Sequence, residues 1–181
     1  MDSRNPVAIL RDLELKGHQG TQVVLPEAQP VTGLSGLAFC IGGERLFIPL
    51  DELKEVYSYA RHPKPTLVPN AKSWLVGMSS LRGQLLAVVD LAQFLELGRA
   101  NGRRIGRVLV AKHPRAAAGL LVDEVTGLRH FTSLQKAHKG PAFKGRVANF
   151  LNEVYHQDGH YWGSLSVYKL VQHPEFSSAI E

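Results

Sequence analysis

Short apolar segments of strand length, each bounded by glycine, proline or charged residues, constrain the fold of this chain most strongly. The nine segments of this kind are LAFCI (37–41), ERLFIPL (44–50), EVYSYA (55–60), SWLVGMS (73–79), QLLAVV (84–89), GRVLVA (106–111), AGLLVDEV (118–125), RVANFLNEVY (146–155) and HYWGSLSV (160–167). Helical spacing is confined to short pieces at 51–53, 91–97 and 167–171. Many short strands with few helices predict an all-β protein, a barrel or a sandwich. No fixed-period repeat is visible.

Two dipeptides predict tight hairpin turns. Gly42-Gly43 supplies the positive φ angles that a two-residue turn needs. Asp158-Gly159 predicts a second turn of the same length. This turn would place His156 and His160 diagonally on different faces of the hairpin, so their i, i+4 spacing does not predict a metal site.

The length and composition are those of an ordinary globular protein. With 181 residues, 44% of them hydrophobic and 20% charged, the chain fits one domain or two small fused lobes. The single Cys40 makes no intramolecular disulfide, and the first residues lack a secretory pattern. No apolar run reaches the roughly 18 residues that span a bilayer. We therefore expect a cytoplasmic protein that reaches a membrane only through a partner.

An N-terminal extension precedes the strands. Residues 7–16 (VAILRDLELK) have helical spacing after Asn5 and Pro6, which suit an N-cap and a first helical position. The pattern stops at Gly17, and a proline-punctuated linker follows. We expect residues 1–32 to form a helical extension and linker.

The net charge of +5 is concentrated in the middle of the chain. Residues 99–146 carry 11 Lys and Arg against 2 Asp and Glu, whereas both flanking segments are slightly acidic. Such a segment is compatible with a small basic β-barrel module that binds nucleic acid, which is the alternative function. The charges fall mostly in connections and lack interleaved aromatic residues, which favours solubilising loops and no nucleic-acid partner.

No motif predicts catalysis, a cofactor or a metal. Neither of the common glycine patterns for phosphate binding occurs, and no nucleophile and base are paired. The acidic pairs Asp51-Glu52 and Asp123-Glu124 begin a helical turn and end a strand, where carboxylates are ordinary surface residues. Asp90 stands between AVV and LAQFLEL, the position of a helix N-cap. Cys40 is expected to pack as a small apolar residue. We therefore expect a protein that is not an enzyme.

Three collinear blocks form a recognisable pattern: GLAFCIGGERLFIPLDELKEVY, WLVGMSSLRGQLLAVVDLAQFLELG and RVLVAKHPRAAAGLLVDEVTGL. They resemble the CheW-like adaptor family of bacterial chemosensory signalling. The segments VPNAKSWLVG, VDEVTGLRHF and KLVQHPEF are most similar to adaptors of the systems that govern type IV pilus twitching motility. Three positions differ from the family pattern, with Ser80 for Asn, Ala87 for Pro and Ser58 for Glu. The resemblance implies that this glutamate pairs with the arginine in relatives, so Ser58 leaves open which residues Arg82 contacts.

The resemblance implies two packed five-stranded SH3-like β-barrels with short helices. The CheW-like domain would span residues 33–172, with a first barrel at about 33–98, a second at about 104–166, and an exchange of strands between them left open. Residues 173–181 would be a C-terminal tail. Trp74 and Trp162 are expected to be core anchors.

The resemblance also implies a non-enzymatic adaptor that couples a membrane chemoreceptor to a CheA-type histidine kinase. One surface of the first barrel would bind the regulatory domain of the kinase. A groove between the barrels would take the cytoplasmic tip of the receptor's helical hairpin. Residues SSLRG would form an exposed turn that presents Arg82. The expected partner-binding residues are Arg82, Gly83, Leu81, Val56 and Leu109.

Overall fold

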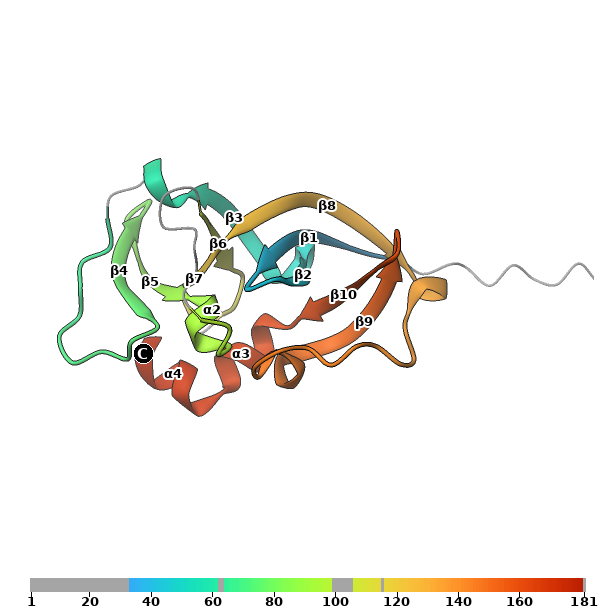
Figure 1. Ribbon diagram of the computed structural model, residues 1–181. Helices are drawn as coiled ribbons and strands as arrows, with labels where there is room; N and C mark the ends of the chain where they lie inside the picture. Colours follow the sequence, from blue (N-terminus) through green and yellow to red (C-terminus); the bar gives the residue numbers. More distant parts are fainter. Residues whose placement is uncertain (1–32, 62–63, 99–105, 115, 181) are drawn as a thin grey trace, which may run out of the picture. The chain divides into compact units, whose positions relative to one another are not determined.

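The computed structural model describes residues 33–61, 64–98, 106–114 and 116–180. Contacts divide the chain into Met1–Val31 and Thr32–Glu181, and every element below belongs to the second unit. The helix expected at residues 7–16 and its linker lie outside the described residues. Within those residues, ten strands form two five-stranded mixed sheets (Figure 1). The expectation of a mostly β protein is confirmed, and the finer description as SH3-like barrels stays a prediction.

The first sheet has the strand order β8-β1-β2-β10-β9. Its strands are β1 (Gly33–Ile41), β2 (Glu44–Pro49), β8 (Glu124–Thr132), β9 (Leu151–Gln157) and β10 (His160–Leu165). Neighbouring strands are antiparallel except β2 and β10, which run parallel. The chain therefore leaves this sheet after β2 and returns to it at β8.

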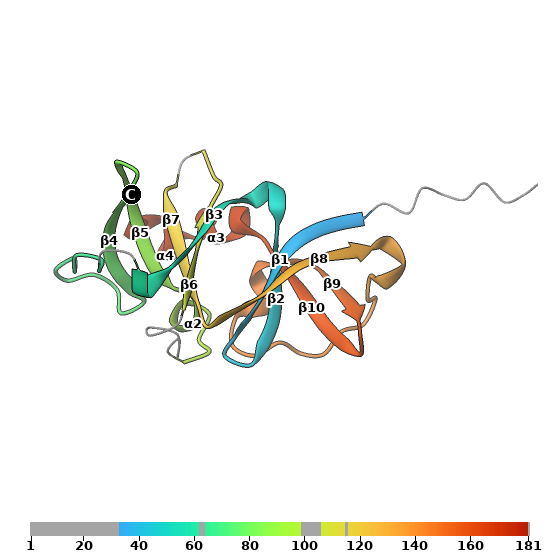
Figure 2. The same ribbon diagram turned by 90° about the horizontal axis from the view of Figure 1, so that it is seen from above.

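The second sheet is built from the stretch between those two strands and has the order β3-β6-β7-β5-β4. Its strands are β3 (Leu53–Ser58), β4 (Leu75–Leu81), β5 (Gln84–Asp90), β6 (Arg107–Ala111) and β7 (Ala118–Val122). Figure 2 shows β3 to β7 grouped beside the strands of the first sheet. The expected segments 33–98 and 104–166 each contribute strands to both sheets, so the strands are exchanged between the two halves of the chain.

Both hairpin turns have the geometry expected from their dipeptides. Gly42 and Gly43 have φ angles of 55° and 83°, and Ile41 pairs with Glu44 across the turn. Two-residue turns of this kind require positive φ at both central positions, which glycine adopts without strain. At the second turn, His160 pairs with Gln157, so the histidine at 156 lies further along the hairpin, opposite residue 161.

The helices of the described residues are short. They are η1 (Leu50–Glu52), η2 (Tyr59–Arg61), α2 (Leu91–Phe94), η4 (Ser133–Gln135), η5 (Val147–Phe150), α3 (Val167–Gln172) and α4 (Pro174–Ile180). Asp90 accepts a hydrogen bond of 3.1 Å from the Gln93 backbone N–H and begins α2, which confirms its assignment as an N-cap. The helix ends at Phe94, three residues before the expected end.

Three elements differ from the sequence-based expectation. The segment AGLLVDEV is not one strand, because β7 ends at Val122 and β8 begins at Glu124 in the other sheet. The first residues of RVANFLNEVY form η5, and the strand begins only at Leu151. The expected tail at 173–181 contains α4, whose Phe176 is fully buried. Apolar residues alone did not reveal these changes of direction.

The core consists of one large cluster shared by the sheets and one smaller cluster in each sheet. The shared cluster joins Phe39 and Ile48 of the first sheet to Val89 and Leu120 of the second. The first sheet also encloses Ala38, Phe47, Phe131, Tyr155 and Trp162. The second sheet also encloses Val76, Leu86, Val88, Val108, Val110 and Leu121. Trp74 belongs to the shared cluster, so both tryptophans are core residues as expected.

The two sheets repeat one supersecondary unit that the sequence does not reveal. Their strand orders and directions correspond, with one parallel pair at the same place in each. In the second sheet the unit runs from Trp74 through the turn residue Arg82 to the N-cap Asp90. In the first sheet it runs from Phe150 through Asp158 to the N-cap Ser166.

The hydrogen bonds of the repeat also correspond. The Asp90 N–H donates to the Trp74 carbonyl at 2.7 Å, and the Ser166 N–H donates to the Phe150 carbonyl at 2.9 Å. Each equivalent pair of residues is 76 positions apart. The matching backbone geometry, carried by different side chains, explains why no repeat is visible in the sequence.

Candidate partner-binding site

The turn between β4 and β5 presents Arg82 to solvent. Leu81 pairs with Gln84, so Arg82 and Gly83 are the two central residues of the turn, with φ angles of 49° and 80°. Such angles favour glycine, and Gly83 meets this demand at the second position. The side chain of Arg82 is 82% exposed. The exposed turn expected from SSLRG is therefore present.

Arg82 makes an ion pair with an acid other than the one that Ser58 replaces. Its Nη2 lies 3.0 Å from Oε2 of Glu55 on β3. The acid comes from a position three residues before Ser58. Exposed pairs of this kind contribute about 1 kcal/mol or less to stability, so the main effect of the contact is to orient the guanidinium.

A second contact joins the same turn to the same strand. Lys54 Nζ donates a hydrogen bond of 2.8 Å to Oε1 of Gln84. β3 and β4 are the two edge strands of the second sheet, and the hairpin that follows β4 touches β3 through both contacts. Tyr57 of β3 packs on the cluster that Val76 of β4 also joins, so side chains from both edge strands contribute to one apolar cluster.

The remaining expected site residues lie in different environments. Val56, on β3, is 38% exposed and is available to a partner. Leu81 is half-buried beside the turn. Leu109 is fully buried in the shared core, so its side chain is not on the surface and its assignment as a groove residue is wrong. The residues next to Leu109 in the sequence are also apolar, so only the packing shows that Leu109 is a core residue and not a groove residue.

A groove with a volume of about 740 Å³ lies beside the turn, and Leu81, one of the expected partner-binding residues, lines it. We call it the Leu85 groove. It is lined, among others, by Leu81, Gln84 and Leu85 of the β4–β5 hairpin, by Lys112 and His113 after β6, and by Tyr168 of α3. Leu85 is 63% exposed, although QLLAVV reads as a buried strand. The polar Gln84 beside it was the available signal that the strand begins in solvent.

The acidic pairs have structural roles. Glu52, expected on the surface, is buried and accepts a hydrogen bond of 2.6 Å from the Val167 N–H. Burial raises the pKa of this carboxyl, and the hydrogen bonds from the start of α3 oppose that rise. Asp123 accepts a hydrogen bond of 3.1 Å from the Gly42 N–H and holds the first hairpin turn. Glu52 lines a cleft with Asp51 and Glu153, but its own carboxylate accepts the hydrogen bond from the start of α3.

The described residues contain no group of three metal-ligating side chains with the geometry of a metal site. Burial also raises the pKa of the Cys40 thiol, which keeps it protonated and suits a packed residue. None of the helices in this described part of the chain is long and apolar enough to cross a membrane.

Two fused β-sheets with a shared core, carrying an oriented arginine beside a partly apolar groove, have the features of a protein-binding module. The family model of the CheW-like domain matches residues 35–175, and the chain belongs to this family. The chain is therefore a CheW-like adaptor of chemosensory signalling and not an enzyme.

Known proteins of the family match to different extents. Protein PilI of Pseudomonas aeruginosa is 31% identical over 175 residues, which cover 97% of this chain and 96% of PilI. Protein FrzA of Myxococcus xanthus is 36% identical over 91 residues, 50% of this chain and 55% of FrzA. The crystal structure of the scaffolding protein TtCheW from Thermoanaerobacter tengcongensis superposes with a TM-score of 0.68. The two sequences are 17% identical, and the match covers 80% of this chain and 96% of TtCheW. This similarity therefore supports the fold alone.

Proposed function

We propose that this chain couples a membrane chemoreceptor to a CheA-type histidine kinase in the cytoplasm, in a pathway that controls type IV pilus twitching motility. The similarity to PilI over nearly the whole of both chains supports the assignment to a pilus pathway. The other relative described above matches only half of the chain. The adaptor forms no covalent bond with its partners. It acts by holding the kinase in a defined position relative to the receptor tip.

Two surfaces divide this work. The Arg82 turn and the adjoining part of β3 bind the regulatory domain of the kinase. A second surface, which includes the exposed Val56, receives the tip of the receptor's helical hairpin. A small movement of the receptor then changes the position of the kinase, because the shared core links the two sheets of the adaptor rigidly.

The observation that carries the proposal is the presentation of Arg82. An arginine on a tight turn, 82% exposed and oriented by Glu55, loses little conformational entropy when it binds a carboxylate. Arginine is also one of the residues that contribute most to protein–protein interfaces.

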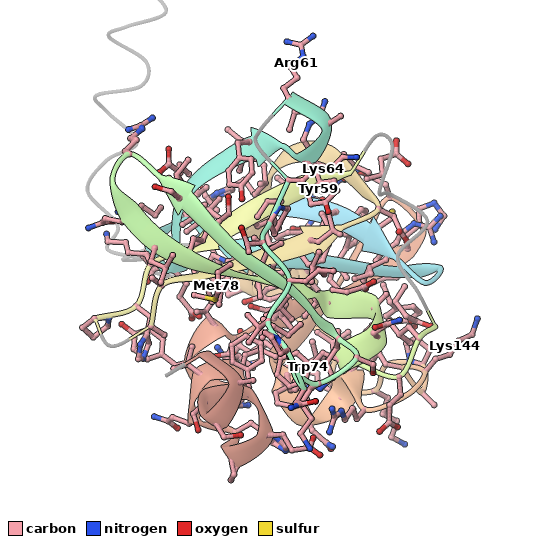
Figure 3. All side chains as sticks on the ribbon, turned by 90° about the vertical axis from the view of Figure 1, so that its left-hand side faces the viewer. Tyr59, Arg61, Lys64, Trp74, Met78 and Lys144 are labelled. Carbon is pink, nitrogen blue, oxygen red and sulfur yellow. The ribbon has the colours of Figure 1, made fainter. Side chains whose placement is uncertain are left out.

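The test is Arg82→Ala, measured by titration calorimetry against the kinase regulatory domain. Truncation of an interface arginine costs about 2 kcal/mol or more, roughly a thirtyfold loss of affinity. The thermal unfolding of the variant should change by no more than about 0.5 kcal/mol, since no core volume is lost. Arg61→Ala is the matched control, because Arg61 ends η2 and points away from the protein (Figure 3).

Wild-type affinity of Arg82→Ala for both partners would show that the arginine is only a solvated turn residue. Mixing the wild-type protein with duplex DNA tests the alternative function. A mobility shift that weakens steeply with added salt would favour nucleic-acid binding over the adaptor function.

A further inference from the structure

A second cleft, which we call the Ser164 cleft, opens at one end of the first sheet. It lies where β1 and β9 begin and where β2 and β10 end, beside η1. Its volume is about 340 Å³, at the lower end of the range that holds small-molecule ligands. Its lining includes Leu34, Pro49, Asp51, Glu52, Glu153 and Ser164.

The hydroxyl of Ser164 has no hydrogen-bond partner among the residues that the structure describes. Ser164 is only 1% exposed, so bulk solvent does not reach its Oγ atom. A buried hydroxyl without a partner costs free energy, and such groups are uncommon in folded proteins. The Ser164 hydroxyl is therefore available to a ligand in the cleft that forms a hydrogen bond with it.

An irregularity in the sheet surrounds Ser164 with polar side chains. The register of β10 against β9 shifts between Gly163 and Leu165. Ser164 therefore lies opposite two residues of β9, Asn152 and Glu153, and both of them line the cleft. A β-bulge of this kind bends a strand and redirects its side chains, and bulges are frequent next to functional sites.

The lining of the cleft is negatively charged. The carboxylates of Asp51, Glu52 and Glu153 belong to it, and no Lys or Arg of the described residues does. Lys136 pairs with Glu153 from outside the lining, and its hydrogen bond lowers the pKa of that carboxyl. Asp51 and Glu52 make no ion pair within the part of the chain that the structure describes. A cation in the cleft would compensate their charge.

The chemistry of the lining indicates which kind of cation fits. A primary ammonium donates through all of its N–H bonds and has no acceptor, which matches a lining of carboxylates and a hydroxyl. Leu34 and Pro49 supply apolar surface on which an alkyl stem can pack, as the stems of lysine side chains do. The described residues offer no set of three metal-ligating side chains here, so an organic cation fits better than a metal ion.

We propose that the Ser164 cleft binds a primary alkylammonium group. The ammonium donates a hydrogen bond to Ser164 Oγ, and Asp51 and Glu52 compensate its charge. The group belongs either to a free small amine or to a lysine side chain of another protein, which present the same chemistry. The Arg82 turn, all of which the structure describes, contributes no residue to this lining, so binding of an amine does not depend on the function proposed above.

The first experiment is a titration of the isotope-labelled full chain with butylamine hydrochloride at pH 7, followed by amide NMR shifts. Saturable shifts should appear at Leu34, Glu153 and Ser164, with a dissociation constant of about 1 mM or lower. Sodium chloride and 1-butanol, at the same concentrations, control for ionic strength and for the alkyl chain. A parallel titration with Nα-acetyl-lysine amide distinguishes the sources. Tighter binding of this derivative indicates a protein side chain, and tighter binding of butylamine indicates a free amine.

The second experiment measures butylamine affinity for variants of the cleft. Ser164→Ala should weaken binding about tenfold, because a hydrogen bond to a charged group is lost. Without amine, its thermal unfolding midpoint should stay the same or rise, since the hydroxyl that it removes is unpartnered. Asp51→Asn should also weaken binding. Glu124→Gln is the matched control, because it removes the same charge at an exposed position outside the cleft.

Four results would overturn the proposal. The first is the absence of saturable shifts, and the second is equal shifts with sodium chloride or with butanol. The third is wild-type affinity in both Ser164→Ala and Asp51→Asn. The fourth is a set of amine-induced shifts centred on Leu85 and Tyr168, which would place the amine in the Leu85 groove, because Asp51 also lines that groove.

Discussion

The indole of Trp74 stacks on the ring of Phe176, with ring centroids 5.9 Å apart and planes inclined by 6°. Phe94 packs edge-on against both rings, at 5.2 Å and 5.0 Å. Trp74, which Figure 3 labels, directly precedes β4, and Phe176 belongs to α4, about 100 residues later in the sequence. The last helix thus completes the core that the two sheets share.

Phe176→Ala should destabilise the protein by about 3–5 kcal/mol, the usual cost of deleting a fully buried phenylalanine. The loss arises from the removed contacts and from the cavity left between Trp74 and Phe94. Urea unfolding followed by tryptophan fluorescence measures it. Ser178→Ala, at an exposed position of the same helix, should change stability by less than about 0.5 kcal/mol. Equal stability of the two variants would mean that α4 is not part of the core.

Asp90→Ala and Ser166→Ala should each destabilise the protein by about 1 kcal/mol, because each removes a helix N-cap. Asp90→Asn and Ser166→Thr retain a capping oxygen and should recover most of the loss. The midpoints of urea unfolding for the four variants provide the comparison. Full stability of either alanine variant would contradict the equivalence of the two caps.

The stability of the protein should fall between about pH 10 and pH 12, in part because of Tyr57. Burial, with smaller contributions from Tyr59 and Glu55, raises the pKa of Tyr57 to about 12. An exposed tyrosine in the unfolded chain has a pKa of about 10 and therefore loses its proton first. Deprotonation then favours the unfolded state until the folded pKa is reached.

The free energy of unfolding in urea, measured at intervals across this range, checks the prediction. Tyr57→Phe has no hydroxyl to ionise, so its stability should decline less steeply over the same range. Parallel pH profiles for the two proteins would show that Tyr57 does not contribute to the alkaline loss of stability.

Deletion of residues 1–30 should leave cooperative unfolding intact. The buried apolar residues of the described core lie between Leu37 and Phe176. Circular dichroism melting of the shortened protein, compared with the full chain, measures the effect. A broad, non-cooperative transition would assign the extension to the folded core.

Much of the local structure could be predicted from the sequence because local chemistry decides it. The dipeptides Gly42-Gly43 and Asp158-Gly159 adopt the positive φ angles that their hairpin turns need. Asp90 caps α2 because its short carboxylate reaches an N–H three residues ahead. Arg82 is exposed because a two-residue turn projects its side chain into solvent.

The sequence did not separate Leu85 from Leu109, because both are leucines in strand-length apolar segments. Leu109 is covered by the shared core, whereas Leu85 lies where β5 begins and is 63% exposed among the residues that the structure describes. Glu55 was missed as the partner of Arg82 for a similar reason. It lies on the edge strand opposite the turn, and its approach depends on how far the second sheet curves.

The sequence by itself determined where strands, turns and helix caps form, because these depend on side chains within a few residues of one another. Only the tertiary structure decided that β3 to β7, which lie between β2 and β8 in the sequence, form a separate sheet. It also decided that the two sheets repeat one unit and that α4 closes their common core. Those arrangements depend on which apolar faces cover one another across long separations in the chain. Many different apolar side chains satisfy that requirement equally well, so it leaves no fixed pattern in the sequence.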